Sequence, residues 1–213
     1  MADRAVVTDR ALVTAPLRQR WESLLPGRTR LGSELLARWS EPHRRYHDLG
    51  HLSDALAALD LLGPASRSEE IALWFHDAVH TSSPGHDEQL SAALAAQELA
   101  TVGVEAAEVA EVVRLVLVTI DHRPRLEDAA GARVSDADLA VLGAGHTRYR
   151  ESVRALRAEA AGLDEESWRA SRRAALAAFD ATRPLFHTAL GHSWWEGRAR
   201  VNLAAEAEDY RRL

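Results

Sequence analysis

The spacing of apolar residues is helical along almost the whole chain. Leu, Ala, Arg and Glu dominate the sequence, and all four are good helix formers. Apolar residues recur three and four positions apart, as Leu52, Leu56 and Leu59 do, so one face of each segment can be buried. Turn-forming residues interrupt this pattern at 26–27, 63–64, 82–85, 123–124 and 143–145. The sequence therefore predicts an all-α fold.

Several of the predicted helices have features of their own. Ser68, followed by Glu69 and Glu70, is typical of a helix N-terminus, and this helix is expected to end at His76-Asp77. Residues 112–118 are rich in β-branched side chains and would locally suit a strand, but the length and flanks of the segment 109–120 favour a helix. Further helices are expected over residues 90–99, 149–160, 165–180 and 195–212.

The length of the chain fits one domain. A chain of 213 residues can bury a sizeable core, and its 46% of hydrophobic residues is ordinary for a globular protein. No segment resembles a long linker or an internal repeat. We expect a single helical bundle over residues 1–213, with the motifs described below in residues 46–143 and a C-terminal helical extension over residues 145–213.

Two missing residue types exclude whole classes of chemistry. The chain has no Cys, and all 26 of its basic residues are Arg. Disulfides, zinc–thiolate sites, Cys nucleophiles and Lys-dependent Schiff-base or P-loop chemistry are therefore excluded. The N-terminus lacks a continuous apolar segment, no apolar run approaches the roughly 20 residues of a membrane span, and the net charge of −6 opposes non-specific nucleic-acid binding. We expect a cytoplasmic protein without a membrane or a stable nucleic-acid partner, and a homodimer is left open.

His76 and Asp77 form the most informative pair in the sequence. The apolar segment 71–75 precedes them, so both are expected at the edge of the core rather than on a solvated face. An imidazole and a carboxylate at such a place can bind one metal ion if further ligands arrive from elsewhere. A helix C-terminus followed by a turn-forming Asp is the alternative interpretation. Seven of the ten histidines lie between positions 43 and 122, which favours the metal site.

Two other segments could supply the further ligands. His47 and His51 are four positions apart, a spacing at which two imidazoles on a helix can hold one metal. Gly50 indicates, however, that His47 precedes the helix and that His51 lies in its first turn. Asp136 and Asp138 add carboxylates far downstream. Together with His76-Asp77, these segments predict a metal-dependent hydrolase.

An ordered series of motifs resembles the HD-domain superfamily of metal-dependent phosphohydrolases. The closer match is a bacterial group with a Tyr-His-x-x-x-His opening and a Trp-Phe-His-Asp-x-Val-Tyr core. Its later motifs are Asn-Glu-x-x-Ser-Ala, Thr-x-x-His, Asp-x-Asp-Leu-x-x-Leu-Gly and Ala-Arg-x-Asn-Leu. The corresponding segments of this chain begin, in the same order, at Tyr46, Trp74, Asp87, Thr119, Asp136 and Ala199. Asp87 stands where the group has Asn, and His80 stands where it has Tyr; both departures bear on the substrate pocket.

The resemblance implies a metal centre with four protein ligands. Two imidazoles and two carboxylates suit a divalent ion such as Mn, Fe, Co, Ni or Zn, and suit Mg less well. Asp138 is preferred to Asp136 because Leu follows it directly, as in the group's motif, and Asp136 remains the alternative. The implied ligands are His51, His76, Asp77 and Asp138.

Other residues are candidates for catalysis and substrate binding. Glu88 is a candidate general base or orienting residue, and His122 could assist as an acid or bind a second metal. Guanidinium groups match the edge of a phosphate, so some arginines are candidate phosphate ligands. The candidate substrate-binding residues are His47, Arg44 and Arg200, with Arg45 as a further arginine.

The leading hypothesis is a metal-dependent phosphohydrolase that acts on a small phosphate ester, with nucleotides among the candidates. The first alternative is an HD-type di-iron oxygenase, for which His47, His80, His86 or His122 would supply additional ligands. The second is a non-catalytic module that senses a nucleotide or another ligand. The intact set of ligands argues against this second alternative.

Overall fold

The computed structural model describes residues 10–211, and all regular secondary structure in this part of the chain is helical. The prediction of an all-α bundle is confirmed. The helices are α1 (Arg10–Leu24), α2 (Thr29–Trp39), α3 (Leu49–Leu61), α4 (Arg67–Phe75), α5 (His86–Thr101), α6 (Ala106–Val118), α7 (Ala129–Leu139), α8 (His146–Glu159), α9 (Glu165–Ala181), α10 (Ala189–Gly191) and α11 (Gly197–Arg211). A 3₁₀ turn, η1 (Ala140–Gly143), precedes α8, and a π-helical turn, η2 (His192–Glu196), joins α10 to α11.

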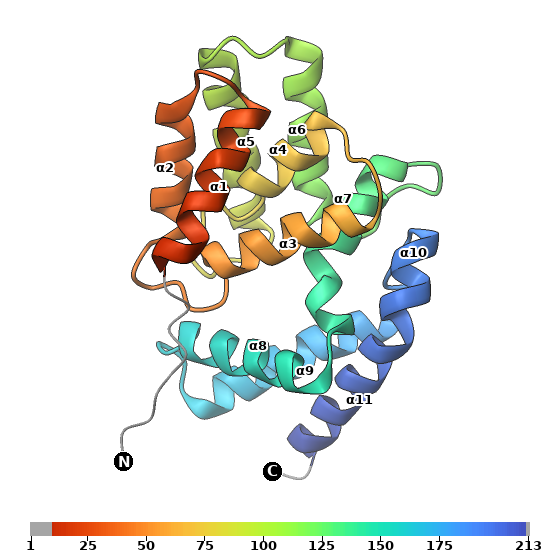
Figure 1. Ribbon diagram of the computed structural model, residues 1–213. Helices are drawn as coiled ribbons and strands as arrows, with labels where there is room; N and C mark the ends of the chain where they lie inside the picture. Colours follow the sequence, from red (N-terminus) through yellow and green to blue (C-terminus); the bar gives the residue numbers. More distant parts are fainter. Residues whose placement is uncertain (1–9, 212–213) are drawn as a thin grey trace.

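The helices form a larger N-terminal body and a C-terminal layer. In Figure 1, α8, α9 and α11 lie together below the body that α1 to α7 form, and α3 runs along the boundary. Asn202 on α11 donates hydrogen bonds from its side-chain amide to the carbonyl groups of Leu142 (2.9 Å) and Ala144 (3.0 Å). These bonds attach the C-terminal layer to the turn that leads out of the N-terminal body.

The short helix α4 is the centre of the N-terminal body. It packs against α1, α3, α5, α6 and α7, and all its residues from Ile71 to Phe75 are fully buried. Burial of each large apolar side chain stabilises the fold by about 1.5–3 kcal/mol, which explains why a helix with apolar residues on every side lies in the middle. The residues that directly follow α4 are therefore held in a fixed place.

The start of α4 differs from the sequence-based expectation. Ser66, not Ser68, is the N-cap, and its hydroxyl accepts a hydrogen bond from the Glu69 backbone N–H at 3.3 Å. Glu69 returns a bond by accepting from the Ser66 N–H at 2.6 Å. This capping box needs Glu three positions after Ser, a spacing that Ser66 meets and Ser68 does not.

The remaining helices agree with their predicted types. The β-branched segment 112–118 lies within α6, which packs against α4 and α5 and so buries Val112 and Val116. Within the C-terminal layer, Glu206 on α11 accepts hydrogen bonds from Arg172 on α9 (2.7 and 2.9 Å) and from the Tyr149 hydroxyl on α8. One buried carboxylate thus joins all three helices of the layer.

The length and hydropathy of the helices bear on membrane insertion. Among residues 10–211, the structure contains no helix that is both long and apolar enough to cross a membrane.

Candidate metal centre

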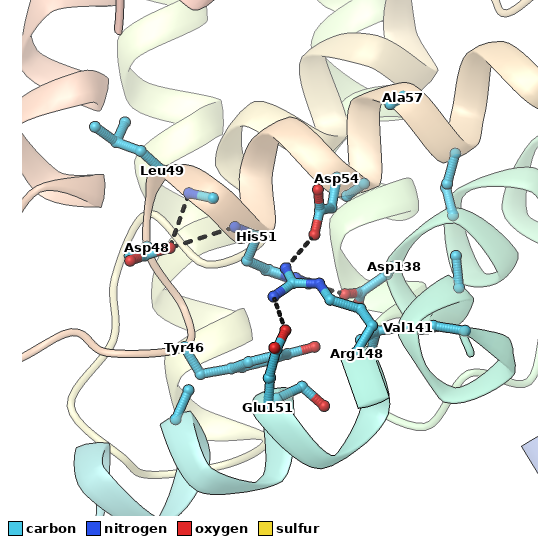
Figure 2. Close-up of a pocket in the computed structure, with 18 of the residues that line it drawn as sticks. Tyr46, Asp48, Leu49, His51, Asp54, Ala57, Asp138, Val141, Arg148 and Glu151 are labelled. Atoms are coloured by element: carbon cyan, nitrogen blue, oxygen red, sulfur yellow. Dashed lines mark hydrogen bonds and ion pairs between the residues drawn. The ribbon is translucent and has the colours of Figure 1, made fainter. Parts of the chain in front are cut away.

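His51 lies in the first turn of α3, as predicted. Asp48 is the N-cap of this helix, and its carboxylate accepts hydrogen bonds from the backbone N–H groups of Gly50 (2.8 Å) and His51 (3.4 Å). An N-cap satisfies N–H groups that a helix start would otherwise leave unpaired. The cap fixes the first turn of α3, from which the buried His51 side chain points toward Asp138 (Figure 2).

His76 and Asp77 directly follow α4. The His76 ring is buried against the indole of Trp39, with 5.3 Å between ring centroids. His76 Nδ1 lies 2.8 Å from the Leu73 carbonyl oxygen. Because a carbonyl oxygen only accepts, the proton of this bond belongs to Nδ1, and Nε2 carries a lone pair when the ring is neutral. This arrangement is typical of a histidine that binds a metal through Nε2.

The two aspartates of α7 have different surroundings. Asp136 is fully buried and accepts hydrogen bonds from the backbone N–H groups of His187 (2.7 Å) and Thr188 (2.8 Å). It holds the segment before α10 in place. Asp138 instead presents Oδ1 to His51 Nε2 at 3.1 Å, as Figure 2 shows. The carboxylate that meets the histidines is therefore that of Asp138.

The four predicted ligands converge on one small volume. The Nε2 atoms of His51 and His76 are 3.2 Å apart. Asp77 Oδ2 lies 3.0 Å from His76 Nε2 and 3.6 Å from His51 Nε2. Asp138 Oδ1 lies 3.5 Å from His76 Nε2 and 3.1 Å from His51 Nε2. Metal ligands at about 2.0–2.2 Å from one ion have comparable spacings among themselves, so the donor atoms fit a single divalent cation.

The charges of the cluster also favour a cation. Burial by itself lowers the pKa of His76, but the charges of Asp77 and Asp138 outweigh burial and raise this pKa well above its usual value. Burial by itself raises the pKa of Asp138, but the positive charge of His76 and hydrogen bonds to His51 and His76 together outweigh burial, and the pKa lies well below its usual value. Two largely buried carboxylates thus hold positive charge between them, as a metal site requires.

Glu88 and His122 lie near different carboxylates of this cluster, Glu88 near Asp77 and His122 near Asp138. Glu88, in the first turn of α5, accepts a hydrogen bond from the Gly85 N–H at 2.5 Å. Burial raises the pKa of Glu88, and the negative charge of Asp77 adds to this effect. His122 follows α6, and its Nε2 lies 3.8 Å from Asp138 Oδ2 while its Nδ1 lies 3.2 Å from the Ser135 hydroxyl. Burial lowers the pKa of His122.

Arg44 and Arg200 are engaged in contacts that support the fold. Arg44 is buried, and its guanidinium donates to Glu41 and to the backbone carbonyls of His47, Asp77 and Ala78. It holds the backbone on either side of the His51–His76–Asp77–Asp138 cluster rather than presenting a free edge to a phosphate. Arg200 donates to Glu196 and to the carbonyls of Phe179 and Thr182, so it ties α11 to the end of α9. The structure does not bring Arg200 to the cluster.

A cavity of about 990 Å³ opens beside His51 and Asp138. It lies between α3 and α8, and Figure 2 shows Arg148 from α8 between Asp54 and Glu151 within it. The Arg148 guanidinium forms ion pairs with both of these carboxylates. The volume is within the range of small-molecule sites. Its arginine lining consists of Arg44, Arg45, Arg148, Arg154 and Arg198.

A second group of potential metal ligands lies next to the first. His47 Nδ1 is 2.5 Å from Glu159 Oε1, and His80 Nε2 is 3.0 Å from the same oxygen. The Glu159 side chain is almost fully buried. The adjacent His47 and His80 together outweigh burial and lower the pKa of Glu159 far below its usual value. Sequence reasoning missed Glu159, because nothing in the sequence distinguishes it from the other acidic residues of an amphipathic helix.

Comparisons with protein-family models, with curated protein sequences and with solved structures found no match to this chain.

Proposed function

We propose that this protein is a metal-dependent phosphohydrolase that acts on a small phosphate ester. The observation that carries the proposal is the convergence of His51, His76, Asp77 and Asp138, which come from α3, the end of α4 and α7. The motif series that resembles HD-domain phosphohydrolases names the same four residues. The proposed substrate is a small molecule, with nucleotides among the candidates, because the adjoining cavity has a matching volume.

The donor set fits a divalent first-row transition ion, and His51, His76, Asp77 and Asp138 would hold it. Such an ion, when bound, lowers the pKa of a water molecule and offsets the negative charge that develops on a phosphoryl group.

The remaining roles fall to other side chains around the cluster. Arginines of the cavity, such as Arg154 and Arg198, provide positive charge near which an anionic substrate can bind. Glu88 is the proposed proton acceptor, because its raised pKa brings it nearer to a working pH than an ordinary carboxylate. The lowered pKa of His122 keeps this imidazole neutral at pH 7, so it can orient Asp138 or a water molecule by hydrogen bonding.

The experiment is a screen of phosphate esters and nucleotides with added Mn, Co, Ni, Zn or Mg, read out as released inorganic phosphate. His76→Ala and Asp77→Ala should abolish turnover, because each removes a proposed ligand. His192→Ala and Asp180→Ala are matched controls, since they remove the same types of side chain from exposed positions, and they should retain full activity. Turnover that survives both ligand substitutions would exclude this site as the catalytic centre.

The two alternatives make different predictions for the same preparations. A di-iron oxygenase would purify aerobically with two irons per chain and would consume oxygen when given its substrate. A sensing module would release no phosphate with any metal, yet a nucleotide would raise its melting temperature. Either pattern would replace the hydrolase proposal.

A further inference from the structure

His80 has a buried ring nitrogen without a hydrogen-bond partner. Its side chain is only 10% exposed. Glu159 Oε1 lies 3.0 Å from His80 Nε2, but the two atoms do not form a hydrogen bond, and no other residue between 10 and 211 offers Nε2 one. An unsatisfied buried polar group destabilises a fold. A bound ligand would give this nitrogen the partner that it lacks, and so would explain why the nitrogen is buried.

A second imidazole reaches the same carboxylate oxygen. His47 Nδ1 lies 2.5 Å from Glu159 Oε1, and the rings of His47 and His80 are tilted by 34° with centroids 4.4 Å apart. The three donor atoms, one each from His47, His80 and Glu159, all lie within 4.8 Å of one another. Two imidazole nitrogens and one carboxylate oxygen are a common ligand set of divalent transition metals in proteins.

Neighbouring groups fix the orientation of all three donors. The other oxygen of Glu159, Oε2, accepts hydrogen bonds from the backbone N–H groups of Arg45 (2.8 Å), Tyr46 (3.0 Å) and His47 (3.0 Å), which leaves Oε1 for the histidines. The Tyr46 ring packs against His47 at 89°. His43 Nε2 donates to the His80 carbonyl at 2.9 Å. Hydrogen bonds and packing of this kind around the ligands are typical of metal sites.

We propose that His47 Nδ1, His80 Nε2 and Glu159 Oε1 bind a second divalent first-row transition ion. Nitrogen-rich ligand sets favour Zn, Co, Ni or Fe(II) over Mg or Ca. Three protein ligands leave coordination positions open for water. This site shares no ligand with the cluster of His51, His76, Asp77 and Asp138. It lies beside that cluster, since the rings of His47 and His51 are 5.7 Å apart between centroids. The inference does not depend on the phosphohydrolase activity.

The test is a titration of the metal-free, full-length protein with Co²⁺, followed by visible absorption and by metal analysis after removal of loosely bound ions. The wild type should bind two Co²⁺ per chain. His80→Phe should bind one, because Phe fills a similar volume without a ligand nitrogen. Glu159→Gln should also lose the second equivalent. His192→Ala should still bind two, because this exposed histidine belongs to neither cluster.

Substitution in the other cluster separates the two sites. His76→Ala should lose one equivalent and keep the Co²⁺ spectrum that His80→Phe loses. If Glu159→Gln unfolds because it weakens the contacts with residues 45–47, His80→Phe decides the question, since it leaves those contacts intact. Saturation of the wild type at one Co²⁺ per chain, or two Co²⁺ retained by folded His80→Phe, would overturn the proposal.

Discussion

His51 Nε2 and His76 Nε2 lie 3.2 Å apart, although the two residues are 25 positions apart in the sequence. Two neutral imidazoles whose Nε2 lone pairs face each other repel, and a positive charge between the two nitrogens removes this repulsion. The negative carboxylates of Asp77 and Asp138 stabilise such a charge. Each has one oxygen within 3.6 Å of both Nε2 atoms. A proton on His76 can supply the charge in the metal-free protein, and a divalent ion supplies it more fully.

The two aspartates of α7 should respond differently to substitution. Asp138→Ala is expected to lose one bound metal per chain. Asp136→Ala should retain full metal content but lower the free energy of unfolding by about 3 kcal/mol, because two backbone N–H groups lose their buried acceptor. Metal analysis after dialysis and urea denaturation measure the two effects. Normal metal content in Asp138→Ala together with metal loss in Asp136→Ala would reverse the assignment.

Removal of metal should destabilise the protein. Chelation with EDTA leaves the buried carboxylates of the cluster without their cation, so the melting temperature should fall and should recover when metal is returned. At a free metal concentration 100-fold above Kd, one site contributes about 2.7 kcal/mol to the free energy of unfolding. Calorimetry with and without metal measures this effect. The double variant His76→Ala/His80→Phe, which lacks one ligand of each cluster, should show no metal-dependent shift. A shift of wild-type size in this variant would mean that the metal binds elsewhere.

Asp87 should stabilise the loop before α5 in a pH-dependent manner. Its carboxylate accepts hydrogen bonds from the Thr81 N–H (2.7 Å), the Thr81 hydroxyl (2.6 Å) and the Ser83 N–H (2.9 Å). Burial alone would raise the pKa of Asp87, but these bonds outweigh burial and lower it below the ordinary value of 3.8. Because the pKa is lower in the folded state, the stabilisation is present above about pH 4 and is lost as the pH falls through the folded pKa.

Asp87→Ala should therefore lower the free energy of unfolding by about 2 kcal/mol at pH 7. The difference from the wild type should shrink below about pH 4, where the carboxyl group of the wild type becomes protonated. Urea denaturation at pH 7 and pH 3 measures both values, and the exposed Asp180→Ala serves as the control with little effect at either pH. An equal difference at both pH values would contradict the assigned role of the carboxylate.

The buried carboxylate of Glu206 should be essential for the C-terminal layer. Glu206→Ala leaves the Arg172 guanidinium buried without its partner and is expected to cost about 3–5 kcal/mol. Glu208 lies two positions further along the same helix and forms an exposed ion pair with Arg211, so Glu208→Ala should cost less than about 1 kcal/mol. Chemical denaturation of both variants provides the comparison. Similar small losses in the two variants would show that the buried ion pair is not required.

The helices could be predicted from the sequence because their apolar periodicity is local information. The β-branched segment 112–118 was predicted as a helix, and it lies within α6. The cap of α4 was misplaced by two residues, because Ser66 and Ser68 both precede acidic residues and only the reciprocal bonds with Glu69 separate them. Local patterns thus predicted the elements but not every boundary.

The contacts of individual polar side chains could not be predicted in the same way. Arg44 was expected to bind phosphate, but its guanidinium already donates hydrogen bonds to three backbone carbonyls. Glu159 gave no signal at all, because its neighbours are His47 and His80, more than 75 positions away in the sequence. Such partners are determined by how α8 packs below the N-terminal body, and a linear pattern does not contain this information (Figure 1).

Anomalous X-ray diffraction from crystals grown with MnCl₂ tests the central claim most directly. The account predicts a manganese peak within about 2.0–2.3 Å of Nε2 of His51, Nε2 of His76 and one carboxylate oxygen each of Asp77 and Asp138. A fully loaded crystal without a peak between these four side chains, or with a peak that His51 and His76 do not reach, would contradict it.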